Sequence, residues 1–227
     1  NFPHEIIFSL EVESDNYQIN AIQFFYTLSS GDVKVYGYPS YTTTKRVQTS
    51  FQIKTSGAHY IPPGTDLVYY YKITNDNGDT LKTEKFTLEY KDPKYNWTKL
   101  RQGNLEILYH DLPHEKVHKI LDNVDPQLQA AKKLFGLQEI QLLKAVIVNG
   151  RNEAERSFPH LSDKATRGHI FGGFAFDNHN LFISQGLNRN TIAHEITHLL
   201  LGQAIYSPMA RVPAWLNEGL AMHFEID

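Results

Sequence analysis

The sequence contains no cysteine. This absence excludes disulfide bonds, cysteine-based catalysis and thiolate metal sites, so a transition metal here needs histidine and carboxylate ligands. Excess charge is also absent, because 22 Lys and Arg oppose 25 Asp and Glu for a net charge of −3. We therefore expect no nucleic acid partner and no anionic membrane partner. Histidine, in contrast, is plentiful, with 11 in 227 residues.

Long apolar segments are missing as well. No run approaches the roughly 18 residues that a membrane span needs, and no charged-then-apolar leader stands at the start of the sequence. We expect that a signal segment has been removed, and that the protein is secreted or exposed at the cell surface of a bacterium or archaeon.

The pattern of the sequence predicts two domains, residues 1–93 and 98–227, joined by a linker. The first is rich in tyrosine, phenylalanine and β-branched residues, and Asn77-Gly78 is a strong hairpin signal. About six short strands predict an immunoglobulin-like or fibronectin-like β-sandwich that serves as an accessory domain. The expected strands lie at 4–14, 20–30, 33–41, 45–55, 67–76 and 80–90.

The second domain mixes strands and helices, so the predicted fold class of the chain is α+β. Strands are expected at 104–110, 142–150, 169–176 and 180–184. Helices are expected at 113–135 (broken at Pro126), 152–158, 190–203 and from Pro213 onward, where proline suits the first helical position.

The pattern His-Glu-x-x-His occurs twice, as HEKVH at 114–118 and as HEITH at 194–198. Two histidines four residues apart lie on one face of a helix with Cβ atoms about 5–6 Å apart, so both imidazoles can reach one zinc ion. The glutamate flanks that face and can act as a general base. A third ligand must come from elsewhere in the chain, and one position stays open for water.

The first motif is predicted to be an exposed helix start. Pro113 places His114 in the first turn, and His118 falls on the flank of the apolar stripe. Lys116 lies inside the motif, where a cation beside a metal ion would be unfavourable. Glu139 is near enough in sequence to be a third ligand, but it follows a helix stop and leads into a strand.

The second motif lies in a helix that is apolar around nearly its whole circumference, which predicts burial. His194, Glu195 and His198 form one polar strip on it, and buried polar groups need hydrogen-bond partners or a metal. Asn190 is the expected N-cap and Gly202 the expected stop. The alternative is a pair of core histidines satisfied by hydrogen bonds.

Glu218 is the candidate third ligand. It follows His198 by 20 residues and lies in the stretch WLNEGLA, on a helix predicted to start at Pro213. The connecting residues 202–213 are long enough to reverse the chain and bring the second helix beside the first. Two histidines and one glutamate are a known catalytic zinc set, so we expect one Zn²⁺ ion.

HEITH followed by WLNEGLA resembles the gluzincins, the thermolysin-like zinc metallopeptidases, in the bacterial and archaeal peptidase MA-like branch. The resemblance covers about residues 100–227. It implies a zincin-like fold with the metal on two helices, in an endopeptidase or aminopeptidase that acts on a peptide or protein substrate. It also implies that His194, His198 and Glu218 bind zinc, and that Glu195 acts first as general base and then as acid.

The resemblance also implies which residues bind the substrate. In these families an edge strand before the metal helix pairs with extended substrate, and the stretch GGFAFDNHNLFIS at 172–184 lies where that strand is expected. The alternative is an ordinary glycine-containing hairpin. The implied substrate-binding residues are Gly172, Gly173, Phe174 and Ala175.

The sequence departs from the gluzincin pattern in two ways. Met222 stands where thermolysin has an aspartate that orients a zinc histidine, so Asn217 or a backbone carbonyl must take that role. Gluzincins also place an oxyanion-stabilising Tyr or His beyond the third ligand. Here the candidates are His223, with a surface or core role as the alternative, and Tyr206. We expect that the C-terminal helical subdomain of the family is lacking.

A second interpretation belongs to another functional class. The protein would be a surface-exposed binding protein whose β-sandwich contacts a partner, with a structural or inactive zinc site. The complete set of motif residues opposes this interpretation, because decay of catalytic function would tend to remove Glu195 first.

Overall fold

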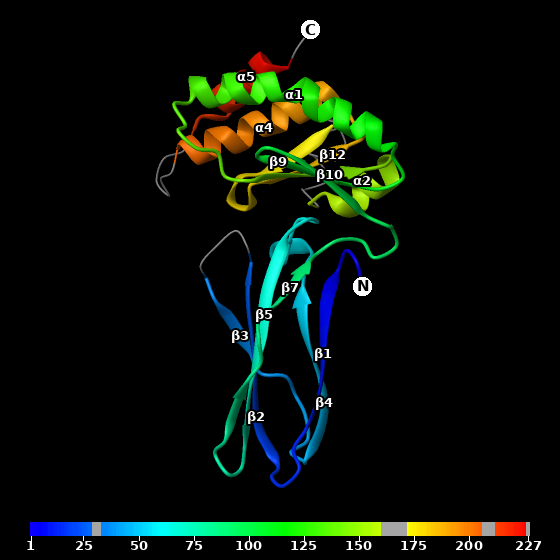
Figure 1. Cartoon of the computed structure of the whole chain (residues 1–227), viewed down its shortest axis with the longest axis vertical. Coiled ribbons are helices and arrows are strands. Elements are labelled where there is room, and N and C mark those ends of the chain that lie inside the picture. The colour runs from blue at the N-terminus through cyan, green and yellow to red at the C-terminus, as the bar shows by residue number, and fades with distance from the viewer. Residues whose placement is uncertain (29–32, 160–171, 206–211, 226–227) are drawn as a thin grey trace. The chain divides into compact units, whose positions relative to one another are not determined.

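The computed structural model describes residues 1–28, 33–159, 172–205 and 212–225 (Figure 1). The chain forms two compact units, Asn1–Ile61 with Thr65–Lys91, and Pro62–Gly64 with Asp92–Asp227. The first contains antiparallel sheets, and the second contains the helices around one mixed sheet. The predicted α+β class is therefore confirmed. No helix in the described ranges is long and apolar enough to cross a membrane.

The first unit consists of two antiparallel sheets. One sheet pairs β1 (Glu5–Glu13) with β4 (Arg46–Lys54). The other has the order β3-β2-β5-β6, with β7 also paired to β5. Its strands are β3 (Val35–Gly37), β2 (Ile19–Leu28), β5 (Asp66–Asn75), β6 (Thr80–Lys82) and β7 (Phe86–Glu89).

Two expected strands are shorter than predicted. The strand expected at 33–41 is reduced to β3, and Pro39, which has no N–H to donate to a ladder, lies beyond its end. The strand expected at 80–90 is divided into β6 and β7. Between them, the Tyr71 N–H donates to the Thr83 hydroxyl (3.0 Å), so a side chain interrupts the backbone ladder.

An aromatic core fills the space between the two sheets. Phe24 of β2 is fully buried, and its ring centroid lies 4.8 Å from that of Phe8 on β1 and 4.7 Å from that of Phe51 on β4. Side chains from both sheets thus share one core, as aligned sheet packing requires. The identity of this unit as an immunoglobulin-like domain stays a prediction.

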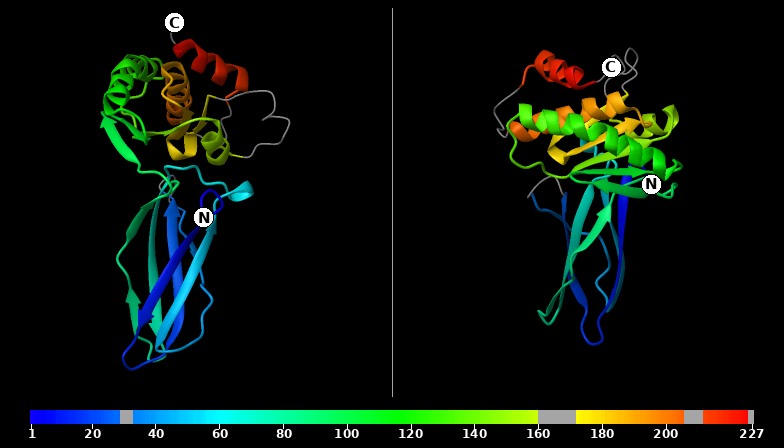
Figure 2. Two further views of the ribbon diagram at one scale, coloured as in Figure 1. Left: turned by 90° about the vertical axis from the view of Figure 1, so that its right-hand side faces the viewer. Right: turned by 45° about the horizontal axis from the view of Figure 1, so that its top comes forward.

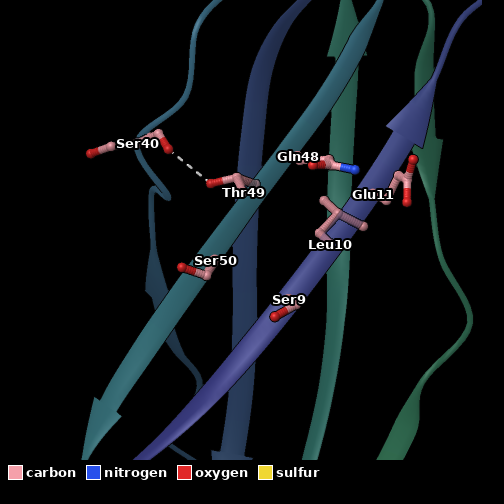
Figure 3. A pocket seen from close by; sticks show the side chains of 7 residues that line it. All are labelled: Ser9, Leu10, Glu11, Ser40, Gln48, Thr49 and Ser50. Carbon is pink, nitrogen blue, oxygen red and sulfur yellow. Dashed lines mark hydrogen bonds between the residues drawn. The ribbon is translucent and has the colours of Figure 1, made fainter.

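An open pocket of about 700 Å³ lies on β1 and β4 (Figure 3). Most of its lining consists of hydroxyl and amide side chains, and the Thr49 hydroxyl donates to the Ser40 carbonyl (2.8 Å). Glu11, the one charged residue of the lining, accepts a hydrogen bond from Arg46 Nε (3.0 Å). This pocket therefore offers no set of groups suited to metal binding or acid–base catalysis.

The second unit is built on a five-stranded sheet with the order β11-β12-β10-β9-β8. The three inner strands run parallel, and the two edge strands are antiparallel to their neighbours. The strands are β8 (Thr98–Gln102), β9 (Leu105–Tyr109), β10 (Leu143–Val148), β11 (Gly173–Phe176) and β12 (Leu181–Gln185).

Helices cover both faces of this sheet (Figures 1 and 2). Leu143, Ala145 and Ile147 of β10 face one core, which they share with α1 (His114–Leu134) and α4 (Arg189–Ala204). Val146 and Val148 of β10 pack with α2 (Arg151–Ser157) on the other face. Helix α5 (Ala214–Phe224) lies against α4. Strand β10 is buried throughout and apolar apart from Lys144, as expected for a central parallel strand.

Three predictions about the helices are wrong. Helix α1 continues through Pro126, which is exposed, so water can satisfy the carbonyl that loses its partner there. The N-cap of α4 is Asn188 and not Asn190, because the Asn188 side chain accepts from the Thr191 N–H (3.0 Å). Gly202 lies inside α4. A Cβ at that position would approach Asp177 Cβ to 2.9 Å, so close packing explains the glycine.

Candidate metal centre

Helix α4 holds the HEITH motif at the edge of the core. Its apolar residues, among them Ile192, Ile196 and Leu199, are buried against the sheet and α1. The two motif histidines are partly exposed on the side of α5. The helix is thus fixed by its apolar faces, and its polar strip faces a second helix.

Three ligand atoms converge between α4 and α5. The Nε2 atoms of His194 and His198 are 3.0 Å apart, and Glu218 Oε2 lies 3.4 Å from the first and 3.8 Å from the second. A tetrahedral zinc ion with bonds of about 2.0–2.1 Å separates its ligands by about 3.3 Å. The triangle therefore has the size that zinc requires. Within the described part of the chain, no other group of three ligands comes this close.

The other nitrogen of each histidine faces an acceptor on the helix α5 side. His194 Nδ1 lies 2.5 Å from Glu225 Oε1, and His198 Nδ1 lies 2.8 Å from Asn217 Oδ1. Because these oxygens accept hydrogen bonds, both Nδ1 atoms carry the hydrogen and both Nε2 atoms present lone pairs. Two lone pairs and a carboxylate oxygen then face one another, an arrangement that a bound cation stabilises.

Burial favours the metal-binding form of His198. Removal from water, together with the neighbouring His194, lowers the pKa of His198, and the contacts with Asn217 and Glu218 oppose this shift. A lowered pKa keeps the imidazole neutral near pH 7, and the neutral form is the one that binds a metal. Glu218 is more exposed than the histidines, with 57% of its side-chain surface accessible.

Glu195 is buried beside the three ligands, with 6% of its surface exposed. Burial, with smaller contributions from the nearby carboxylates of Glu218 and Glu225, raises the pKa of Glu195 to about 8. A carboxyl group with such a pKa exchanges its proton near neutral pH. That property suits a group that must act as base and as acid in one reaction.

The proposed substrate strand lies directly against α4. In the described part of the chain, β11 is the edge of the sheet and pairs with β12. A Cβ at Gly173 would approach Glu195 Oε1 to 2.6 Å, and one at Gly172 would approach Thr191 Oγ1 to 2.9 Å. The glycines thus allow the strand to approach the metal helix closely. Phe174 and Ala175 continue the same strand and are partly exposed.

With Glu195 as the predicted general base, we expect Gly173→Ala to lower kcat by at least about tenfold, because small displacements of a catalytic group are costly. The added methyl group must displace the Glu195 carboxylate or move β11 away from α4. Zinc affinity should stay at the wild-type value, since the three ligands lie on α4 and α5. Steady-state kinetics with a peptide substrate and zinc titration measure the two quantities. Wild-type kcat in this variant would contradict the described packing.

The two oxyanion candidates receive no support from the structure. His223 is exposed, and its ring packs edge-on against Phe224 at a centroid distance of 5.1 Å. Tyr206 lies outside the described residues. Met222, which replaces the orienting aspartate of thermolysin, is 64% exposed. The contact between Glu225 and His194 was not predicted from the sequence. A usable signal existed, because a residue seven positions after Glu218 returns to nearly the same side of a helix.

The first motif, HEKVH, forms the exposed start of α1. His114 Nδ1 lies 2.9 Å from the Tyr109 hydroxyl, and His118 Nδ1 lies 3.1 Å from Asp122 Oδ2. Each histidine thus has its own partner. Glu139 is exposed in the connection between α1 and β10. Neither motif histidine belongs to the converging group found among the described residues.

Comparison with known protein families agrees with this geometry. Residues 167–227 match the Peptidase MA superfamily. The Peptidase MA match includes α4 and α5, and therefore both histidines, Glu195 and Glu218. It supports a gluzincin-like peptidase for this part of the chain. No curated protein matches the sequence.

Proposed function

We propose that the protein is a zinc-dependent metallopeptidase of the gluzincin type. The observation that supports this function most strongly is the convergence of His194 Nε2, His198 Nε2 and Glu218 Oε2, each within 4.8 Å of the others. The acceptors on Nδ1 leave both Nε2 lone pairs free to bind a cation. The Peptidase MA match over the same residues supports the reaction class.

Zinc held by these three residues would supply a Lewis acid that makes water nucleophilic near neutral pH. Glu195 accepts the proton that water loses as it attacks the carbonyl carbon of the peptide. Glu195 then donates this proton to the leaving amine nitrogen, and the C–N bond breaks. Its buried position beside the ligands suits both transfers.

The substrate in this proposal is an extended peptide or protein segment that pairs with the outer edge of β11. Among the described residues no strand lies beyond β11, so its outward backbone N–H and C=O groups can form a ladder with another chain. The Gly172 carbonyl accepts from the Gln185 N–H, which sets the alternation along β11. Phe174 therefore pairs with β12, and the outward groups are those of Gly173 and Ala175. Contact between Gly173 and Glu195 brings the same strand to the catalytic carboxylate.

The setting of the enzyme is part of the proposal. We place it outside the cell or on its surface, with the first unit as an immunoglobulin-like accessory domain. The two antiparallel sheets that share an aromatic core support that domain type.

Hydrolysis of casein or of a peptide library by the full chain tests the proposed function. Zinc-loaded protein should cleave, a chelator should abolish cleavage, and added zinc should restore it. A zinc-loaded wild-type chain that cleaves no substrate would overturn the peptidase proposal. It would favour a binding protein with an inactive zinc site.

A further inference from the structure

The His194 ring contacts a residue that lies outside both motifs. Glu218 Oε2 lies 3.4 Å from Nε2, and Glu225 Oε1 lies 2.5 Å from Nδ1. These nitrogens are on opposite sides of the imidazole. Glu225 therefore does not join the three converging ligands, and its carboxylate instead holds the nitrogen that points away from them.

The chain fixes Glu225 firmly enough for this role. It is the C-cap of α5, and its backbone N–H donates to the carbonyls of Ala221 and Met222. The preceding residue, Phe224, is buried in the core, where its ring centroid lies 6.4 Å from that of Phe135. The end of α5 is thus anchored, and Glu225 extends from this anchor toward α4.

A carboxylate on Nδ1 has two chemical effects. It fixes the tautomer with hydrogen on Nδ1, so that the Nε2 lone pair faces the metal, and it makes the imidazole a stronger ligand. Hydrogen bonds to charged acceptors are also stronger than those to neutral ones. His198 has only the neutral amide of Asn217 at the corresponding position. The hydrogen bond that holds the His194 ring is therefore stronger than the one that holds the His198 ring.

We propose that Glu225 is the positioning residue for His194 in the metal centre, an inference that rests on the proposed zinc site. Met222 is unable to take this role, because it has no strong hydrogen-bond acceptor and is exposed. Glu225 orients and strengthens a ligand, so its loss should weaken metal binding without removing a ligand.

The test measures zinc and cobalt binding by the full chain and three variants. Glu225→Ala should weaken zinc affinity by about 10- to 100-fold in competition with a chromophoric chelator. Glu225→Gln keeps an oxygen acceptor and should weaken affinity less. With saturating Co²⁺, the visible absorption bands of Glu225→Ala should differ from those of the wild type. The control is Glu155→Gln, which removes an exposed carboxylate on α2 and should bind both metals normally.

The opposite results would overturn the positioning role alone or together with the proposed function. Wild-type zinc affinity and an unchanged cobalt spectrum in both Glu225 variants would overturn the positioning role while leaving the metal centre intact. A wild-type chain that binds no zinc would overturn both the role and the proposed function. If circular dichroism shows that Glu225→Ala is misfolded, the isosteric Gln variant decides. The zinc affinity of Glu225→Gln must then be lower than that of Glu155→Gln.

Discussion

Glu195→Gln is expected to lower kcat by about 10²- to 10⁴-fold, the contribution of general acid–base catalysis, while zinc stays bound. Glutamine has nearly the same shape, so it should fit the buried position next to Gly173. Its amide cannot take a proton from water at neutral pH. Turnover of a peptide substrate and zinc content by elemental analysis measure the two effects.

The sequence supplies a matched control for that experiment. Glu115 has the same place in HEKVH that Glu195 has in HEITH, but it lies exposed in the first turn of α1. Glu115→Gln should therefore have wild-type turnover. Wild-type activity in Glu195→Gln, or an equal loss in Glu115→Gln, would show that Glu195 is not the general base.

His194→Ala is expected to weaken zinc affinity by more than about 100-fold, because even changes to groups behind the ligands cost about 10- to 100-fold. The substitution leaves two protein ligands where catalytic zinc normally has three. Zinc per chain after dialysis should fall from about one to near zero. Zinc-dependent thermal stabilisation should disappear with it, since only binding to the folded state provides it.

His114→Ala is the matched substitution in the other motif. His114 interacts with the Tyr109 hydroxyl and does not belong to the converging ligands, so this variant should retain zinc and activity. Zinc loss in His114→Ala together with retention in His194→Ala would reverse the ranking of the two motifs.

The main features of the centre were accessible from the sequence because they depend on local helix periodicity. The four-residue spacing of His194 and His198 places both on one face, and the apolar residues around them predict a buried helix. The distance in sequence to Glu218 allows a chain reversal. These inferences need only helix geometry, and the structure places the three ligand atoms together.

Other features depend on tertiary packing, which the sequence alone does not show. Asn188 and Asn190 are equally good caps by type, and only the path of the chain selects the first. The glycine at 173 is explained by the carboxylate that lies 2.6 Å from its missing Cβ. Glu225 reaches His194 because Phe224 anchors the end of α5 in the core.

The edge strand β8 was also not predicted from the sequence. Its segment Thr98–Gln102 is mostly polar, and its partly buried residues, Leu100 and Gln102, lie on one face only. Such a pattern lacks the apolar run of a buried strand, as in β10, and resembles a loop in sequence. Its pairing with β9 becomes visible only when the sheet is assembled.

Anomalous scattering at the zinc absorption edge, from crystals of the full chain grown with zinc, would locate the bound metal. The metal assignment predicts one strong peak bounded by His194 Nε2, His198 Nε2 and the Glu218 carboxylate, with the Glu195 carboxylate beside it but outside bonding distance. A peak at His114 and His118 instead, or no peak among the three predicted ligands, would contradict it.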